Sequence, residues 1–288
     1  MSASQRGTVA VVIPFYRDDQ WFPHALESVL TQSRRPDEVI VVDDASPVGT
    51  AQALESPPTG VRVIRLAHNS GPGRARQVGT EAATSEYVCY IDADDLWSPD
   101  FVGTCVAHLS ADSTIEAVYT AIAKRLPDGT VKPFVDKPPH LTVREAIVRF
   151  HAYPALAMMF RRAALLAVGG WDTSRHAVED WDLVVRFLDR FGGIPLVAGP
   201  LPQYRVAHAP GRRNAVGWDM LRRWRFTATR NRELIERYFG PRAHRRRMAQ
   251  AIRDRADVVG GITGRTMQLV RPVFGTPLDA SWPMEQTS

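Results

Sequence analysis

The stretch YVCYIDADDLW at residues 87–97 decides the fold of this chain. Its first part, residues 87–91, has the length and apolar composition of a buried strand. Carboxylates follow it directly, at Asp92, Asp94 and Asp95. Because ionised carboxylates do not stay buried without partners, the strand must end where they reach water or a cation. We therefore place them on a short loop at the edge of a sheet.

A helix is predicted to follow that loop. Ser98 suits the N-cap and Pro99 the first helical position, and the apolar residues after them fall on one helix face. The loop thus joins a strand to a helix at the carboxyl edge of the sheet, where open α/β folds bind ligands. Hard oxygen ligands at that edge suit Mg²⁺ or Mn²⁺ carrying a substrate phosphate, although a solvated acidic turn has the same composition.

Strand and helix alternate from residue 8 to residue 109. Near-continuous apolar strands are predicted at 8–15 and 39–42, and an alternating strand at 61–66, with helices between them. This pattern predicts an α/β fold with a Rossmann-like, mostly parallel central sheet flanked by helices on both faces. Polar residues follow each strand, so we expect one edge of the sheet to gather Tyr16, Asp18, Asp43, Asp44, His68, Asn69, Asp92 and Asp94.

The second half of the chain is less regularly patterned. Strands are predicted at 118–126 and 154–160, and residues 194–205 run extended. Thr142 and Glu145 have the spacing of a capping box, which predicts the start of a helix.

Further helices are predicted in three places. A poorly patterned helix covers residues 48–54. Another opens at Glu179, with Asp182 and Arg186 paired along its outer face. Residues 218–268 are helical and basic. The simplest division is one domain over 1–212, with two halves (1–115 and 116–212), and a basic helical C-terminal extension over 213–288.

The composition is that of an ordinary soluble globular protein. The 288 residues are 44% hydrophobic and 23% charged. No signal peptide is evident, and no apolar run approaches the roughly 18 residues that span a membrane, so we expect a cytoplasmic protein. The two cysteines fall on predicted core positions and indicate packing rather than a disulfide framework.

Positive charge is concentrated towards the end of the chain. The formal net charge is +5, and arginine dominates the last third, as in residues 222–225 and 245–247. Such clusters attract phosphates, anionic lipid or nucleic acid, and a solvated basic helix face has the same pattern. No recognition motif supports nucleic acid. Peripheral contact with the anionic inner face of a membrane is the alternative to plain solvation.

Six motifs, taken in order, make the chain resemble glycosyltransferase family 2, built on the glycosyltransferase A fold. They are VVIPFYRDD at 11–19, EVIVVDDAS at 38–46, HNSGPGRARQVG at 68–79, YIDADDLWSPD at 90–100, GGWD at 169–172 and EDWDLVVR at 179–186. The resemblance implies an enzyme that transfers a sugar, with inversion, from a nucleotide diphosphate sugar to an acceptor nucleophile.

The resemblance implies that residues 1–212 are a catalytic domain, with a nucleotide-sugar-binding half (1–115) and an acceptor-side half (116–212). It also assigns the donor side of the site. It implies nucleotide-sugar contacts from Pro14, Tyr16, Asp18, Asp44, Gly71, Arg74, Arg76, Asp92, Ala93 and Asp94. Asp44 matches the acidic residue that bonds the base, and it could instead cap a helix. The glycine-rich turn before Arg76 is also ordinary helix-start chemistry. The donor we expect is a UDP-sugar.

A divalent metal, Mn²⁺ or Mg²⁺, is implied by the same resemblance. Asp94 is the expected direct ligand, Asp92 bonds ribose or acts through water, and Asp95 supports them. His208 could complete the metal site as a neutral imidazole, and Arg205 could bind phosphate. For these last two, a surface histidine and a surface arginine are the alternatives.

Asp180 matches the general base of the family. Inversion requires a base on the sugar face opposite the departing diphosphate. The alternative role, a first-turn acid on the following helix, is compatible because a helix N-terminus keeps a carboxylate ionised. Trp171, Glu179 and Trp181 are implied on the acceptor side. The acceptor is left open between a saccharide, a lipid-linked molecule and a small molecule.

Departures from the family narrow the expected function. Processive synthases carry QxxRW, whereas the similar stretch at 221–225 lacks Gln, so a single transfer fits better. Phe15 stands where many members have Thr or Ser. A sugar nucleotidyltransferase would have a glycine-rich first loop, which residues 14–17 lack. A non-catalytic nucleotide-sugar-binding scaffold would have lost Asp94 or Asp180.

Overall fold

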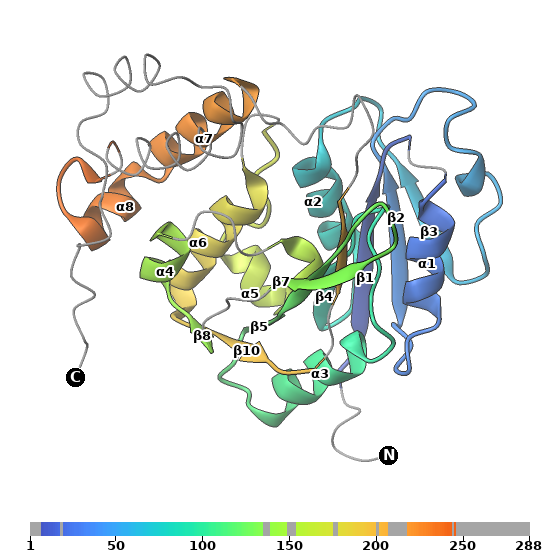
Figure 1. Cartoon of the computed structure of the whole chain (residues 1–288), viewed down its shortest axis with the longest axis horizontal. Helices are drawn as coiled ribbons and strands as arrows, with labels where there is room; N and C mark the ends of the chain where they lie inside the picture. Colours follow the sequence, from blue (N-terminus) through green and yellow to red (C-terminus); the bar gives the residue numbers. More distant parts are fainter. Residues whose placement is uncertain are drawn as a thin grey trace. The chain divides into compact units, whose positions relative to one another are not determined.

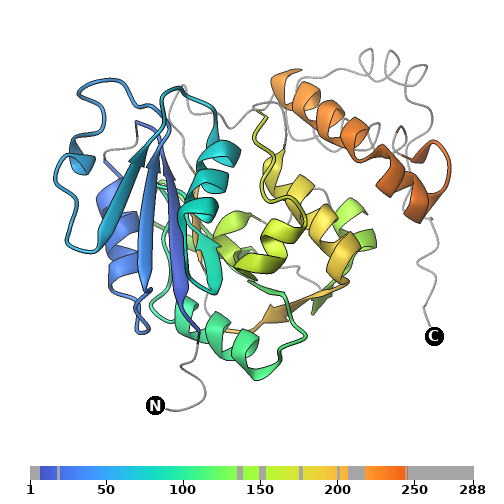
Figure 2. The same cartoon turned by 180° about the vertical axis from the view of Figure 1, so that it is seen from behind.

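The computed structural model describes residues 7–17, 20–134, 139–148, 154–174, 178–199, 202–206, 218–243 and 245 (Figures 1 and 2). The predicted site residues Asp18 and His208 lie outside these ranges. The chain divides into two compact units. The first holds residues 1–175 and 179–210, and the second holds residues 176–178 and 211–288.

Four parallel strands form the first half of the main sheet. They are β1 (Val9–Phe15), β2 (Glu38–Asp43), β3 (Val61–Arg65) and β4 (Tyr87–Tyr90), in the spatial order β3-β2-β1-β4. Each neighbouring pair is parallel. β1 and β4 are buried along their whole length, as expected for parallel strands covered on both faces.

Helices cover both faces of these strands. They are α1 (Phe22–Leu30), α2 (Pro72–Ala82) and α3 (Phe101–Ala111). Val11 of β1 shares a hydrophobic core with Leu26 of α1 and Val106 of α3. Gly79 of α2 lies against Val12, where an added Cβ would come within 2.3 Å of Cγ1. Because successive strand residues point to opposite faces, α1 and α3 lie on one face and α2 on the other (Figures 1 and 2).

The second half of the main sheet is mixed. Strands β9 (Met158–Arg161), β5 (Ala117–Thr120), β10 (Ile194–Val197) and β8 (His140–Leu141) continue the order from β4. β9 is antiparallel to both neighbours, β10 is parallel to β5, and β8 is antiparallel to β10. Among the described strands of this sheet, β8 and β9 alone oppose the common direction. The predicted mostly parallel sheet is confirmed.

A second, three-stranded sheet contains β11 (Gln203–Arg205), β6 (Ile122–Arg125) and β7 (Val131–Phe134), in that order. The prediction of one strand over residues 118–126 is therefore wrong. The chain leaves the main sheet between Thr120 and Ile122, and β5 and β6 belong to different sheets. Both strands begin with buried residues, so a continuous apolar pattern does not reveal the change of sheet.

The remaining helices of the first unit are α4 (Val143–Val148), α5 (Arg162–Ala167) and α6 (Glu179–Phe191), with the short η2 (Gln52–Leu54) and η3 (Ala155–Ala157). The predicted capping box at α4 is confirmed. The Thr142 N–H donates to Glu145 Oε2 at 2.9 Å, and the Glu145 N–H donates to Thr142 Oγ1 at 3.3 Å.

Three local predictions need correction. The helix after the acidic loop begins at Phe101, because the Phe101 N–H donates to the Ser98 carbonyl and closes a turn first. The helix predicted at 48–54 is reduced to the single turn η2.

The third correction concerns a side-chain pair. Asp182 and Arg186 do pair, at 2.6 Å, but the Asp182 side chain is completely buried rather than on an outer face. Arg186 also donates to two carbonyls of the preceding turn, which draws the pair inward.

The second unit contains α7 (Trp218–Arg230) and α8 (Arg232–Phe239). Thr227 Oγ1 accepts the Val178 N–H at 2.9 Å, and Leu234 and Ile235 are buried. The predicted basic helical segment is confirmed up to residue 239; most of its remainder lies outside the described residues. Among the described residues, none of the helices is both long enough and apolar enough to cross a bilayer.

Candidate active site

Polar residues gather at the carboxyl edge of the main sheet, as the sequence predicts. Phe15 at the end of β1 pairs with Asp43 at the end of β2. Tyr90, at the end of β4, pairs with Val12 of β1. Tyr16 and Asp44 therefore follow paired strand ends directly, and Asp92 lies two residues beyond Tyr90 at the same edge.

Arg76 joins the two predicted halves of the site. Its guanidinium donates to Asp92 at 2.7 Å, to Glu179 at 3.2 Å and to Asp180 at 3.3 Å. The side chain is only 3% exposed. Burial on its own would lower the pKa of Arg76, but the three carboxylates outweigh it and hold that pKa above its ordinary value. One buried cation thus connects the loop after β4 with the first turn of α6.

The local sequence explains how Arg76 reaches this position. Gly71 precedes α2 with a φ of +92°, a conformation that favours glycine. Gly73 packs so closely on the turn before α6 that an added Cβ would come within 2.2 Å of the Asp172 carbonyl oxygen. Arg76 follows one helical turn after Gly73, and its guanidinium lies 4.9 Å from the centre of the Trp171 ring.

Helix α2 also fixes the GGWD turn. Gly170 has a φ of +65° and lies directly against the Gln77 side chain. The Trp171 N–H donates to Gln77 Oε1 at 2.8 Å. The buried Trp171 ring meets the Tyr90 ring edge-on, with 4.8 Å between centroids. Trp171, predicted on the acceptor side, therefore forms the wall behind Arg76.

Asp180 occupies the first turn of α6 beside Arg76. Its side chain is 31% exposed. The surrounding protein nevertheless displaces water from the carboxylate, and this burial raises its pKa. Arg76 acts in the opposite direction, Glu179 and Asp92 raise the pKa further, and the resulting pKa is about 7. A carboxylate with this pKa can accept a proton near neutral pH, as a general base must.

The other two predicted acceptor-side residues differ in position. Glu179 contacts Arg76 and borders the site. Trp181 is 5% exposed, and its Nε1–H donates to the Ala146 carbonyl of α4 at 2.8 Å. The Trp181 indole therefore packs α6 against α4, and the structure does not bring it together with Arg76.

Asp44 builds the glycine-rich turn. Its two carboxylate oxygens accept the N–H groups of Ser70 at 2.6 Å and Gly71 at 2.7 Å. The Asn69 side chain donates to the Asp44 carbonyl at 3.1 Å. The residue predicted to bond the base thus holds the end of β2 against the start of α2.

Three further donor-side residues lie at or near the same edge. Pro14 is buried near the end of β1, whereas Tyr16 and Arg74 are exposed. The Arg17 guanidinium lies 4.9 Å from the centre of the Tyr16 ring. Of the three, Tyr16 and Arg74 can reach a ligand in solution.

The acidic residues of the DxD loop, residues 92–96, have three different environments. Asp92 is 38% exposed and accepts from Arg76. Asp94 is half-buried, and Ala93 between them is buried. Asp95 is 1% exposed; burial, together with Asp94 and Asp92, raises its pKa well above the ordinary range. Its Oδ1 accepts the Arg205 N–H at 2.8 Å, and its buried Oδ2 has no hydrogen-bond partner among the described residues.

Strand β11 braces the DxD loop from the other side. Leu96 and Gln203 exchange backbone hydrogen bonds of 3.1 and 2.7 Å. Arg205 Nε donates to the Asp94 carbonyl at 2.9 Å, and its guanidinium lies 3.8 Å from the centre of the Trp21 ring. Sequence reasoning missed this brace. Its members come from three distant segments, and no local pattern links them.

The donor set of the DxD loop fits a divalent cation held together with a substrate. In the described part of the chain, no group of three or more His, Cys, Asp or Glu residues is arranged to hold a metal. Mg²⁺ and similar cations commonly take only one or two carboxylates, and substrate phosphates and water complete the shell. Asp92 and Asp94 offer hard oxygens of this kind, with Asp95 buried behind them. Ligation by His208 falls outside the described residues.

Comparison with known proteins establishes the family. The model for "Glycosyl transferase family 2" matches residues 10–165, more than half of the chain. The chain belongs to glycosyl transferase family 2. The expectations of this family and of an enzyme are therefore confirmed.

The transferase has curated bacterial relatives. It is 32% identical over 143 residues to the putative teichuronic acid biosynthesis glycosyltransferase TuaG of Bacillus subtilis. That match covers 48% of this chain and 56% of TuaG, so the chain spans about half the length of this relative.

Two solved structures share the fold of the transferase. S. aureus TarS 1-349 in complex with UDP-GlcNAc superimposes with a TM-score of 0.65 at 20% identity, over 84% of this chain and 71% of that one. Mannosyltransferase PcManGT from Pyrobaculum calidifontis, in complex with GDP-Man and Mn²⁺, gives 0.59 at 20% identity, over 94% and 81%. The predicted glycosyltransferase A fold class is confirmed.

Proposed function

We propose that the transferase moves a single sugar from a nucleotide diphosphate sugar to an acceptor nucleophile, with inversion and with a divalent metal. The observation that carries this proposal is the buried link from Asp92 through Arg76 to Asp180. The Arg76 guanidinium thus bonds both Asp92, which is assigned to donor binding, and Asp180, which is assigned to the acceptor as its base. Direct transfer requires the two substrates to meet at such a place.

In the proposed reaction, Asp180 takes the proton of the acceptor nucleophile. The nucleophile bonds to the anomeric carbon from the face opposite the diphosphate, and the bond to the diphosphate oxygen breaks with its electron pair on that oxygen. The pKa of about 7 supports this role, because Asp180 is ionised above neutral pH yet basic enough to hold the proton. Arg76 orients the carboxylate and keeps its pKa from rising further.

Asp94 and Asp92 would hold the metal, Mn²⁺ or Mg²⁺. When bound, the cation supplies charge that offsets the charge developing on the leaving diphosphate. The buried Asp95 side chain, and Arg205 through its bond to the Asp94 carbonyl, would fix the orientation of the loop.

We propose a UDP-sugar as the donor. TarS was solved with UDP-GlcNAc and PcManGT with GDP-Man, which supports the class of nucleotide diphosphate sugars. The acceptor we propose is a saccharide, a lipid-linked molecule or a small molecule. The family match sets aside the sugar nucleotidyltransferase considered from the sequence.

The second unit is proposed as a basic extension that contacts an anionic membrane surface. Exposed arginines on α7 and α8 include Arg222, Arg225, Arg230, Arg232 and Arg237, and Phe226 is 39% exposed among them. Cations beside an exposed aromatic ring favour a lipid headgroup layer. Sedimentation with liposomes tests this: loss of the protein from phosphatidylglycerol liposomes after the five Arg→Gln changes supports it, and sedimentation independent of anionic lipid contradicts it.

The proposed function is tested by donor binding and product stereochemistry. UDP and GDP are titrated calorimetrically with Mn²⁺ into the wild type, Asp94→Asn and the exposed-turn control Asp128→Asn. Metal-dependent binding that Asp94→Asn removes and Asp128→Asn keeps is the expected result. Proton NMR of the product then reports the anomeric configuration. Metal-independent binding, or retention of configuration, would contradict the proposal.

A further inference from the structure

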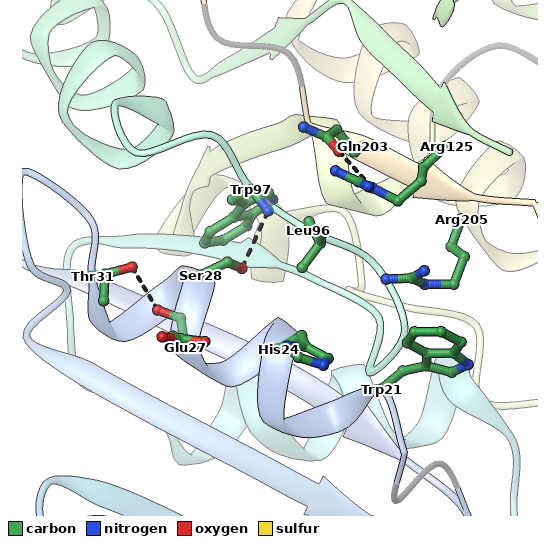
Figure 3. Close-up of a pocket in the computed structure, with 10 residues that line it drawn as sticks. All are labelled: Trp21, His24, Glu27, Ser28, Thr31, Leu96, Trp97, Arg125, Gln203 and Arg205. Atoms are coloured by element: carbon green, nitrogen blue, oxygen red, sulfur yellow. Dashed lines mark hydrogen bonds between the residues drawn. The ribbon is translucent and has the colours of Figure 1, made fainter. Parts of the chain in front are cut away.

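A cleft of about 490 Å³ opens beside the DxD loop, on the side of α1 (Figure 3). One wall is α1, the other is formed by β6 and β11, and Leu96 and Trp97 lie between them. The volume is within the range of small-molecule sites, about 300 to 1,000 Å³. Arg76, Asp92 and Asp180 do not line it. The cleft is therefore separate from the cluster proposed for the reaction.

The two walls carry complementary hydrogen-bonding groups (Figure 3). The α1 wall presents the exposed Glu27 carboxylate. The Thr31 hydroxyl, just past the end of α1, donates to the Glu27 backbone carbonyl at 2.7 Å and can accept from a ligand. The opposite wall presents the guanidinium groups of Arg125 and Arg205. Arg125 is oriented by its own neighbour, because its Nε–H donates to Gln203 Oε1 at 2.9 Å.

This chemistry suits a sugar that carries a negative charge. Ring hydroxyls both donate and accept, so they can donate to Glu27 while they accept from an arginine. Two arginines face one glutamate, which leaves the cleft positive and favours an anionic substituent on the arginine wall. A purely apolar ligand would leave these polar groups unpaired.

We propose that this cleft binds an acidic sugar unit of the acceptor, one that bears a carboxylate or a phosphate, at a distance from the reacting hydroxyl. The inference rests on the proposed function, because it assumes a saccharide acceptor. It adds a specificity subsite, with Arg125 as its main anion-binding residue.

Binding in the cleft is coupled to the donor site through the brace. Gln203 and Arg205 line the cleft, and the same two residues hold Leu96, Asp94 and Asp95 of the DxD loop. A sugar that orders these side chains also orders the loop. By linkage, UDP with Mn²⁺ must then strengthen sugar binding by the same factor by which the sugar strengthens UDP binding.

The test titrates glucuronate, glucose 6-phosphate and glucose into the full chain, with and without UDP and Mn²⁺. Both acidic sugars should bind, glucose should bind at least about tenfold more weakly, and UDP with Mn²⁺ should tighten the acidic sugars. If only one acidic sugar binds, it identifies the anionic group. Failure of both, or equal binding of glucose, overturns the proposal.

Three variants test whether the acidic sugars bind in this cleft. Arg125→Gln should weaken the acidic sugars about tenfold. Glu27→Gln should tighten them about threefold, because the amide oxygen still accepts from a ring hydroxyl and the negative charge that repels the anion is lost. Arg62→Gln, an exposed arginine on β3, is the matched control and should change nothing. Binding that Arg125→Gln leaves unchanged belongs to another site and overturns the proposal. If Arg125→Gln does not fold, Glu27→Gln decides: tighter binding supports the subsite and unchanged binding overturns it.

UDP and GDP binding is measured in the same preparations. It distinguishes failure of the subsite proposal from failure of the proposed function. If UDP or GDP binds with Mn²⁺ but no acidic sugar binds, the subsite is wrong and the proposed function stands. If neither UDP nor GDP binds with Mn²⁺, the proposed function has failed.

Discussion

Two arginines flank the DxD loop, and they differ in what they hold. Arg76, on the α2 side, is 3% exposed and bonds three carboxylates. Arg205, on the β11 side, is half-buried, donates to the Asp94 carbonyl and lies over the Trp21 ring. The first balances buried charge among groups proposed to react. The second fixes the backbone of the loop that carries them.

The difference separates an electrostatic role from a geometric one. A buried cation among three carboxylates cannot be removed without leaving their charges uncompensated. The half-buried Arg205 guanidinium contacts a carbonyl and a ring, and its charge lowers the pKa of one nearby buried carboxyl, that of Asp95. We therefore expect changes at Arg76 to affect both stability and chemistry, and changes at Arg205 to affect chiefly ligand binding.

The largest effect is expected for Arg76→Met. Loss of the cation leaves Asp92, Glu179 and Asp180 to repel one another, so the free energy of unfolding should fall by about 3 to 5 kcal/mol. Urea unfolding measures the change, with the exposed Arg62→Met as the matched control, which should fall by less than about 1 kcal/mol. Equal stability of the two variants would contradict the compensating role of Arg76.

The pH dependence of stability and of activity also tests the Arg76 side of the DxD loop. Folding raises the pKa of Asp180 to about 7, so the stability that its proton contributes is present at low pH and is lost as the pH rises through about 7. Activity has the opposite sign because the base must be ionised. We expect kcat/KM to rise tenfold per pH unit and to level off above about 7.

Variants of the two arginines should differ in the midpoint of the pH profile of kcat/KM. Arg76→Lys, which cannot reach all three carboxylates, should move the midpoint upward, because Arg76 lowers the pKa of Asp180. Arg205→Lys should leave the midpoint in place. A midpoint that moves equally in both variants would remove the distinction between the two sides.

A smaller effect is expected for Arg205→Ala. The DxD loop would lose the side-chain bond to the Asp94 carbonyl, and the contact between Arg205 and Trp21 would also be lost, while the backbone bonds between Leu96 and Gln203 persist. Metal-dependent UDP binding, measured by calorimetry, should weaken about tenfold, and unfolding should change little. A loss of stability comparable to that of Arg76→Met would show that Arg205 also balances buried charge.

The smallest effect is expected for Trp21→Leu. This change removes the ring beneath the Arg205 guanidinium, a contact worth about 0.5 to 1 kcal/mol. UDP binding should weaken no more than about fivefold, and Trp21→Phe should restore most of it. A loss greater than that of Arg205→Ala would place Trp21 in direct contact with the nucleotide.

The sequence predicted the fold well wherever a pattern is local. Apolar strands followed by polar residues predicted β1 to β4 and their common edge, and the Thr142–Glu145 spacing predicted the start of α4. The break between β5 and β6 was missed, because buried strands in two different sheets have the same apolar pattern. Asp182 was misplaced because helical spacing predicts a pair but not the carbonyls that draw it inward.

The candidate site was predicted residue by residue but not in its connections. Arg76, Asp92 and Asp180 were each singled out from motifs, yet nothing in their spacing shows that one guanidinium bonds both carboxylates. The brace by Trp21 and Arg205 depends on packing between distant segments. Sequence patterns report which face a residue occupies, and they do not report which distant residue it meets.

The central claim, that Asp180 is the base beside the donor carboxylates, is tested most directly by Asp180→Asn. The amide keeps the shape of the side chain and cannot take the proton of the acceptor. Transfer from the nucleotide sugar that the wild type uses is measured beside metal-dependent UDP binding by calorimetry. We predict that Asp180→Asn binds UDP with wild-type affinity and loses transfer at least about a hundredfold. Transfer within a few-fold of wild type would contradict the account and move the base to another residue.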